Sequence, residues 1–148
     1  MYINKNLYEK ICKNIPILCI DLIISFDRKY LLLNRKNPPL RGEYWLPGGR
    51  ILLGESFTDA ACRIMKKELS IELCDSIKSS FVFCGNTNMV YNQSIFGNHK
   101  YHTPALVFSI KLNSLPGITL DETSLGYIWS ERLPEMFLSN FSNSIDYV

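Results

Sequence analysis

The feature that most constrains this chain is a turn with two glycines followed by an amphipathic helix, in residues 47–69. The turn reads Pro-Gly-Gly-Arg, and Ser56 then offers a good N-cap for a helix. Apolar residues recur over residues 57–69 at the spacing of one helix face. Glu68 follows Ile64 by four residues, so its carboxylate falls on that apolar face. A carboxylate there is costly unless it reaches solvent or pairs with a cation.

Spacing alone leaves two interpretations of Glu68. In one, the side chain simply reaches solvent at the end of the helix. In the other, it binds a divalent cation together with a backbone carbonyl of the turn Gly48-Gly49, where glycine permits unusual backbone geometry. Magnesium suits the second interpretation, because it takes few protein ligands and completes its shell with water and substrate phosphates.

Composition indicates a single globular domain over residues 1–148. Hydrophobic residues make up 47% of the chain and charged residues 20%. A net charge of +2, spread over scattered cations, argues against a nucleic-acid interface. The apolar stretch of residues 15–24 contains Asp21 and is too short to span a membrane. The first residues lack a signal-peptide core, and five cysteines without a C-x-x-C pair suit reduced thiols, so we expect a cytoplasmic protein.

Hydrophobic periodicity predicts strands with a few helices around them, which is typical of an α/β layered domain. Helices are expected at residues 4–13, 56–69 and 131–138, and strands at 15–26, 30–34, 44–46, 81–84, 89–91, 104–112 and 126–129. Residues 86–99, which are rich in Asn and Gly, are expected to form a loop beside the substrate pocket.

Four residues of the turn and helix stand in the frame of the Nudix box: Gly49, Glu55, Arg63 and Glu68. The chain therefore resembles the Nudix superfamily, whose members hydrolyse nucleoside diphosphates linked to another group, with magnesium or manganese. The resemblance implies a Nudix-type α/β/α sandwich with a mixed central sheet. Glu55 and Arg63 are expected to pair and hold the loop to the helix, and Asp59 to form a surface pair with Arg63.

The box is incomplete. Ile64 and Lys67 stand where the usual pattern has glutamates, and Ser70 stands where it has glycine. Those glutamates serve the metal site in typical members, so a typical pyrophosphatase site would be impaired.

One branch of the superfamily, the GDP-mannose mannosyl hydrolases, has also lost two of these glutamates and resembles this chain more closely. The shared features are Asp21, the run YLLLNRKNPPLRGEYWLPGGR with its Arg35 and Arg50, and the later segment LDETSLGYIW. Enzymes of this group direct water at the anomeric carbon of the sugar and release GDP and free hexose. The resemblance implies a GDP-sugar substrate, Mg²⁺ with Mn²⁺ as the alternative, and a homodimer.

The same resemblance suggests roles for individual residues. Arg35 and Arg50 would hold the diphosphate and neutralise the leaving GDP, since a guanidinium offers a fixed fork of donors. Asp21 would bind substrate. Gly49, Glu68 and Glu122 would hold the metal ion.

The general base of the mannosyl hydrolases has no counterpart at the matching position of this chain. Thr123 and Ser124 stand where the group has a glutamine and its histidine base, and neither hydroxyl is basic enough near neutral pH. Three alternatives remain open: His99 or His102 acts as base, Asp121 or Glu122 does, or the protein has no base. The resemblance implies a GDP-sugar hydrolase that attacks the anomeric carbon, with two alternatives: a domain that binds a nucleotide sugar without turnover, or a hydrolase that attacks phosphorus.

Overall fold

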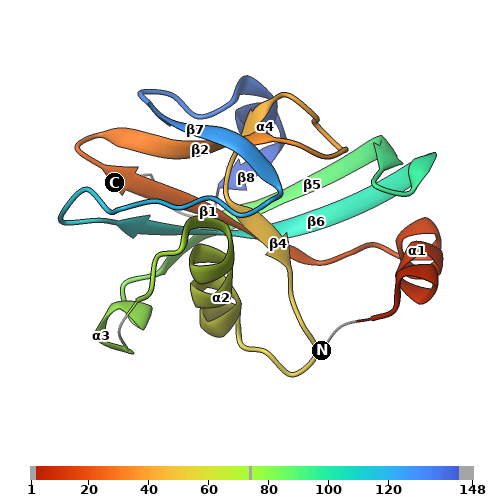
Figure 1. Cartoon of the computed structure of the whole chain (residues 1–148), viewed down its shortest axis with the longest axis horizontal. Coiled ribbons are helices and arrows are strands. Elements are labelled where there is room, and N and C mark those ends of the chain that lie inside the picture. Colours follow the sequence, from red (N-terminus) through yellow and green to blue (C-terminus); the bar gives the residue numbers. More distant parts are fainter. Residues whose placement is uncertain (1–2, 74, 144–148) are drawn as a thin grey trace.

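A curled mixed sheet forms the centre of the protein (Figure 1). The computed structural model describes residues 3–73 and 75–143. The elements in chain order are α1 Lys5–Asn14, β1 Cys19–Phe26, β2 Lys29–Arg35, β3 Tyr44–Trp45, β4 Gly48–Arg50, α2 Phe57–Leu69, α3 Asp75–Lys78, β5 Val82–Ser94, β6 Gly97–Lys111, β7 Ser124–Ser130, α4 Glu135–Asn140 and β8 Phe141–Asn143.

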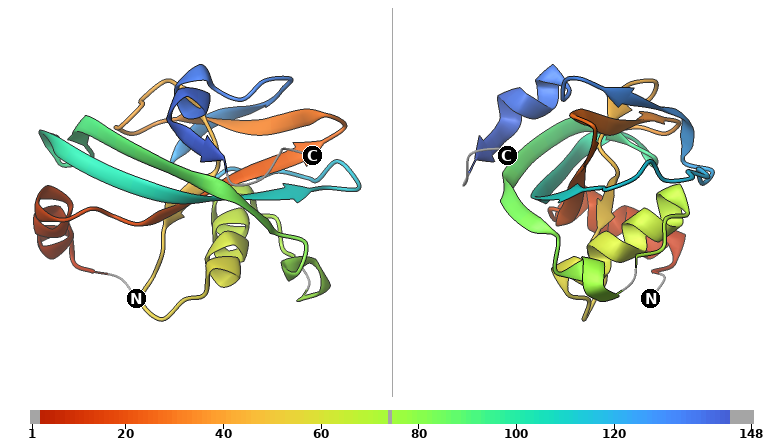
Figure 2. Two further views of the ribbon diagram at one scale, coloured as in Figure 1. Left: turned by 180° about the vertical axis from the view of Figure 1, so that it is seen from behind. Right: turned by 90° about the vertical axis from the view of Figure 1, so that its left-hand side faces the viewer.

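The sheet runs in the order β3-β2-β1-β6-β5-β8, with β4 added to β1 and β7 added to β2. β1 and β6 are parallel, whereas the other pairs are antiparallel. The helices α2 and α4 lie on opposite faces of the sheet (Figures 1 and 2). The predicted α/β/α arrangement with a mixed sheet is therefore confirmed.

Helix α2 is built as its sequence predicts. The hydroxyl of Ser56 accepts a hydrogen bond from the backbone N–H of Asp59, which satisfies one of the free donors of the first turn. The helix ends at Ser70, which takes a left-handed conformation with φ 56°. Its buried face consists of Ala60, Ala61, Ile64, Met65 and Leu69. This face packs on the interior side of β1 and β6, and so fixes the end of the helix against the sheet.

The segment expected to be a loop at residues 86–99 is instead part of a long hairpin. β5 and β6 pair along most of their length, with Met89 opposite Thr103 and Tyr91 opposite Tyr101 and with register shifts at residues 83–85 and 91–93. Residues 95 and 96 form the turn. Side chains alternate between buried and exposed over residues 85–90 of β5, and this period of two outweighs the low strand preference of the asparagines there. The prediction of a loop was wrong for this reason.

The ends of other elements also differ from expectation. β1 begins at Cys19 rather than at residue 15, and α4 begins after Pro134, whose ring restricts the backbone before the helix. Among residues 3–73 and 75–143, no helix has the length and apolar character needed to cross a bilayer. The four described cysteines, Cys12, Cys19, Cys62 and Cys84, are free.

Candidate active site

The Pro-Gly-Gly-Arg segment forms the short strand β4 and not an isolated turn. It pairs antiparallel with β1, so that Gly48 lies opposite Asp21 and Gly49 opposite Ile20. Neither glycine has a positive φ angle. Gly48 is instead required by close approach, because a Cβ at this position would lie 2.6 Å from the carbonyl oxygen of Ile20 and within 3.0 Å of Asp21 Oδ1. At Gly49 the nearest atom to such a Cβ would be 3.7 Å away, on Ile64, which is ordinary contact. The expectation that both glycines are needed for unusual backbone geometry is therefore wrong. Gly48 is needed because there is no space for a side chain, and Gly49 is not.

Glu68 lies at the end of α2 beside this strand. The backbone N–H of Gly48 donates to Glu68 Oε2 at 3.2 Å. Burial raises the pKa of Glu68 to about 8, and the negative charge of Asp121 adds to the effect, whereas the hydrogen bond from Gly48 opposes it. The hydrogen bond from Gly48 and the cations Arg35 and Lys67 favour the charged form of Glu68, and a bound cation would favour it further.

A groove of about 600 Å³ runs along Glu68. It is lined by Gly48, Gly49, Arg50, Leu52, Arg63, Ile64, Lys66, Lys67 and Glu68. Lys66 and Lys67 are exposed, as expected, and Lys66 pairs with Glu72 at 2.7 Å. The groove therefore combines one carboxylate with several cations, which suits an anionic ligand together with a metal ion.

Asp121 is a second carboxylate beside Glu68. Its backbone N–H donates to the carbonyl oxygen of Glu68 at 3.3 Å. Asp121 Oδ1 accepts from both the N–H and the hydroxyl of Thr123, but Asp121 Oδ2 is buried with no partner among the described residues. Glu122, the residue predicted to bind metal, is exposed. A buried carboxylate oxygen without a donor, next to another carboxylate, is an arrangement that a divalent cation completes.

A second cavity, of about 200 Å³, opens on the other side of β4 and is called the polar pocket below. It is lined by Tyr8, Cys19, Asp21, Arg35, Pro39, Leu40, Trp45, Leu46, Gly48, Gly49, Arg50, Thr87, Met89, Tyr91, Tyr101, Thr103 and Ala105. Alternate residues of β1, β5 and β6 form its floor, since side chains two apart on a strand share a face. The pocket and the groove share Gly48, Gly49 and Arg50, so the two cavities meet at β4.

The structure brings three of the predicted substrate-binding residues into the polar pocket. Arg35 stands at a bulge at the end of β2, where its Nε donates to the carbonyl oxygen of Pro39 at 2.9 Å. The guanidinium of Arg50 lies 5.0 Å from the ring centre of Tyr8. Burial raises the pKa of Asp21 to about 7, while the charge of Arg35 and a hydrogen bond with Trp45 oppose the rise.

Tyrosines on the pocket wall keep their protons near neutral pH. Burial raises the pKa of Tyr8 to about 12, and it also raises the pKa of Tyr91 and of Tyr101. The hydroxyl of Tyr8 is hydrogen-bonded to Cys12 and Tyr101, whereas Tyr91 keeps its proton as a hydrogen-bond donor on the pocket wall.

The two histidines lie outside both cavities. On β6, His102 stands between Tyr101 and Thr103, which line the polar pocket, so strand alternation turns its side chain to the opposite face. Its Nε2 is hydrogen-bonded to Asn88 Oδ1. His99 is held by Ser94 Oγ and the carbonyl oxygen of Lys100, each at 2.7 Å. The structure therefore does not bring either proposed base together with the arginines.

Comparisons with known proteins show which proteins this chain resembles. No protein-family model matches the chain. Two curated relatives are similar in sequence. The low-salt glycan biosynthesis protein Agl8 of Haloferax volcanii is 33% identical over 107 residues, which is 72% of this chain and 65% of that protein. The ADP-ribose pyrophosphatase of Methanocaldococcus jannaschii is 41% identical over 56 residues, or 38% of this chain and 33% of that protein. The chain thus spans less than two thirds of the length of each relative.

Solved structures resemble the chain over more of its length. The MutT protein of Methanosarcina mazei Go1 has a TM-score of 0.61 at 21% identity, covering 78% of this chain and 76% of that one. The NUDIX domain of Shewanella oneidensis NrtR, complexed with ADP ribose, has a TM-score of 0.59 at 15% identity, covering 95% and 89%. A bifunctional NMN adenylyltransferase/ADP ribose pyrophosphatase of Francisella tularensis, with AMP and a manganese ion, has a TM-score of 0.57 at 23% identity, covering 91% and 39%. The chain has the Nudix hydrolase fold.

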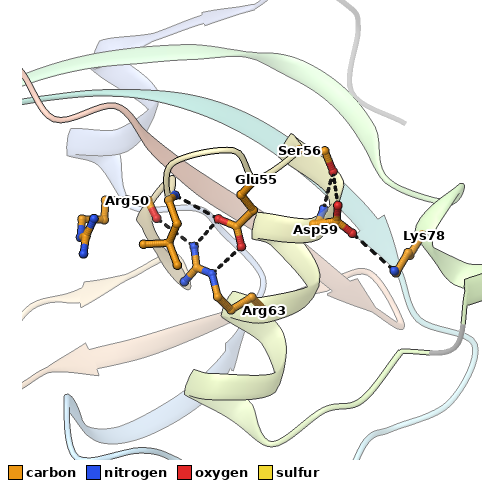
Figure 3. Close-up of polar contacts among 7 residues, drawn as sticks. Arg50, Glu55, Ser56, Asp59, Arg63 and Lys78 are labelled. Atoms are coloured by element: carbon orange, nitrogen blue, oxygen red, sulfur yellow. Dashed lines mark hydrogen bonds and ion pairs between the residues drawn. The ribbon is translucent and has the colours of Figure 1, made fainter. Parts of the chain in front are cut away.

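Within the Nudix box, Glu55 and Arg63 form the expected pair (Figure 3). Arg63 Nε lies 2.6 Å from Glu55 Oε1, and Arg63 Nη2 donates to Glu55 Oε2 and to the carbonyl oxygen of Arg50, each at 2.9 Å. This pair ties the loop before α2 to the helix and to β4, while the side chain of Arg50 points away from it (Figure 3). The expected pair of Asp59 with Arg63 is wrong, because Asp59 binds Ser56 and Lys78 instead.

Proposed function

We propose that the protein is a magnesium-dependent hydrolase of a nucleoside diphosphate linked to a sugar, with GDP-mannose as the model substrate. The observation that carries this proposal is that the groove beside Glu68 and the polar pocket of Arg35 meet at β4. A ligand with a diphosphate and a sugar needs one cationic, metal-binding region and one polar, ring-sized region in contact. The adjoining cavities supply both.

Glu68, Asp121 and the carbonyl of Gly49 would hold the metal ion, with Mn²⁺ as the alternative to Mg²⁺. The orphaned Asp121 Oδ2 and the half-buried carboxyl of Glu68 fit this role. When bound, the ion supplies positive charge to the diphosphate. Replacing Asp121 by Asn should weaken Mn²⁺ binding in a calorimetric titration, whereas the matched variant Glu122→Gln should leave it unchanged. If Glu122→Gln weakens Mn²⁺ binding and Asp121→Asn does not, Glu122 is the metal ligand and Asp121 is not.

Arg35 and Arg50 would bind the diphosphate and stabilise the charge that develops on the leaving nucleotide. Both line the polar pocket, and Arg50 also reaches the groove. Loss of one such fixed charge costs about 3 kcal/mol of the barrier in comparable sites.

Attack at the anomeric carbon is the preferred chemistry. Ile64 and Lys67 replace two box glutamates, so the groove offers fewer carboxylates than a typical site for attack on phosphorus. Of the described residues, Asp21 is the carboxylate that lines the polar pocket, and we assign it the role of proton acceptor. The name of the Haloferax relative, a glycan biosynthesis protein, also supports a nucleotide-sugar substrate.

Attack on phosphorus is the second candidate function, because one relative is an ADP-ribose pyrophosphatase and one structural neighbour holds ADP ribose. The decisive experiment uses ¹⁸O-labelled water, Mg²⁺, and GDP-mannose or ADP-ribose, with the products identified by mass spectrometry. Label in free mannose beside unlabelled GDP supports the preferred function. Nucleoside monophosphate with label in a phosphate supports the second. Intact substrate with magnesium-dependent binding shows a domain that binds without turnover.

A further inference from the structure

Thr87 on β5 carries a buried hydroxyl that the fold does not use. The residue is only 1% exposed, and its Oγ1 has no hydrogen-bond partner among the described residues. Buried polar groups are nearly always paired, because an unpaired one forfeits its interaction with water. Thr87 lines the polar pocket, so a ligand in this pocket can supply the missing hydrogen-bond partner.

The floor of the pocket around Thr87 consists of small side chains. Thr87 lies opposite Ala105 of β6, which in turn lies opposite Cys19 of β1, so these three residues form one row across the sheet. Ala105 offers no side-chain hydrogen bond, and the thiol of Cys19 donates to the carbonyl oxygen of Ile17. The row therefore leaves both space and an open hydrogen-bonding position above the sheet.

The size and charge of the pocket select the kind of group that fills it. A cavity of about 200 Å³ is smaller than the ~300–1,000 Å³ pockets that take drug-sized ligands, so it suits one ring and not a whole nucleotide sugar. Arg35 and Arg50, which also line the pocket, provide for the diphosphate, and Asp21 disfavours a further anion beside Thr87. A neutral ring with several hydroxyl groups meets these conditions.

We propose that Thr87 is a specificity-determining residue whose hydroxyl bonds a sugar hydroxyl of the substrate, with the sugar ring seated on the row of Cys19, Ala105 and Thr87. This inference rests on the proposed function and deepens it, since it assigns the sugar to the polar pocket. A hydroxyl both donates and accepts, so it pairs well with another hydroxyl.

The test compares Thr87→Val, which removes the hydroxyl at similar shape, with Thr87→Ser, which retains it. The probes are GDP-mannose, its monodeoxy-mannose analogues, and GDP. Discrimination is measured as kcat/KM, or as Kd if the protein binds without turnover. We expect Thr87→Val to lose about 3- to 10-fold with GDP-mannose, and Thr87→Ser to stay near the wild type. Affinity for GDP should not change in either variant.

The deoxy series locates the contact. The wild type should discriminate against one analogue, and Thr87→Val should accept that analogue and GDP-mannose equally well. An equal loss for GDP and GDP-mannose, or no loss for either, would overturn the inference while leaving the proposed function intact. If the wild type neither binds nor hydrolyses GDP-mannose or GDP, the proposed function fails first and the role of Thr87 fails with it.

Discussion

Replacing Glu68 by Gln tests the centre of the site, because it removes one charge and little else. The glutamine oxygen can still accept the hydrogen bond that Gly48 donates at 3.2 Å in the wild type. In the metal-free protein, burial raises the pKa of Glu68 from 4.5 to about 8. A carboxyl with a raised pKa in the folded state stabilises the fold below its unfolded pKa, and this contribution is lost as the pH rises through about 8.

The size of the effect follows from that pKa. A rise from 4.5 to about 8 corresponds to a loss of at most about 5 kcal/mol of unfolding free energy across this pH range. Water in the groove screens the charge, so we expect about half of this loss in metal-free wild-type protein. The Glu68→Gln variant has no charge to desolvate and should lack this part of the pH dependence.

Urea unfolding in EDTA at pH 5.5 and pH 8.5 captures about two thirds of this loss, because part of it already occurs between pH 4.5 and pH 5.5. The exposed Glu122→Gln variant serves as control. Adding Mg²⁺ at about 100 times its Kd should stabilise the wild type by about 2.7 kcal/mol at pH 8.5. The same addition should leave Glu68→Gln unchanged. If Glu68→Gln keeps both the wild-type pH slope and the magnesium response, burial does not destabilise the charged form of Glu68, and Glu68 is not a metal ligand. The metal site must then be reassigned to other residues.

Three further predictions concern residues around this centre. Gly48→Ala should cost at least about 2 kcal/mol in urea unfolding, because its Cβ would approach Asp21 Oδ1 within 3.0 Å, whereas Gly49→Ala should cost less than about 1 kcal/mol; equal costs would contradict this assignment. In the pH profile of kcat/KM, activity should rise through about pH 7 as Asp21 loses its proton. Asp21→Asn should lower kcat/KM about 10²-fold or more and abolish the rise. Arg63→Gln should destabilise the fold by about 2 kcal/mol at pH 7, because the largely buried Glu55 loses its partner, and an unchanged urea midpoint would show that the pair is dispensable.

The helix and its carboxylate were predictable from the sequence because a single periodicity determines both. The apolar stripe of α2 is continuous, and Glu68 falls on it in the sequence and in the structure. Ser56 and Glu55 were predictable as well, since N-caps and box pairs depend on residues close in the chain. Arg35 and Arg50 reach the polar pocket from the ends of β2 and β4. Their role in holding the diphosphate stays a prediction.

Other parts of the site depend on contacts between distant segments, which the sequence does not reveal. Asp121 and Glu122 are neighbours in a segment without regular secondary structure, so no period tells which of them faces Glu68. The alternation of Thr87 and Met89 along β5 was a usable signal, but the asparagines between them obscured it. His102 was expected near the pocket, and only its position within β6 shows that it faces away.

The charges of the groove bear on our proposal that this Nudix fold binds a diphosphate without two of the box glutamates. Arg63 is engaged by Glu55, and Lys66 pairs with Glu72, whereas Lys67 forms no ion pair among the described residues. Lys67 therefore places a free cation where the usual pattern has a carboxylate.

A carboxylate at position 67 would help to bind a further metal ion, whose charge would then face the phosphates. A lysine supplies positive charge directly, without a metal, and a fixed charge suits a departing diphosphate better than it suits the activation of water at phosphorus. Under the proposed function, the lysine would support cleavage on the sugar side of the substrate, and the ¹⁸O experiment tests this.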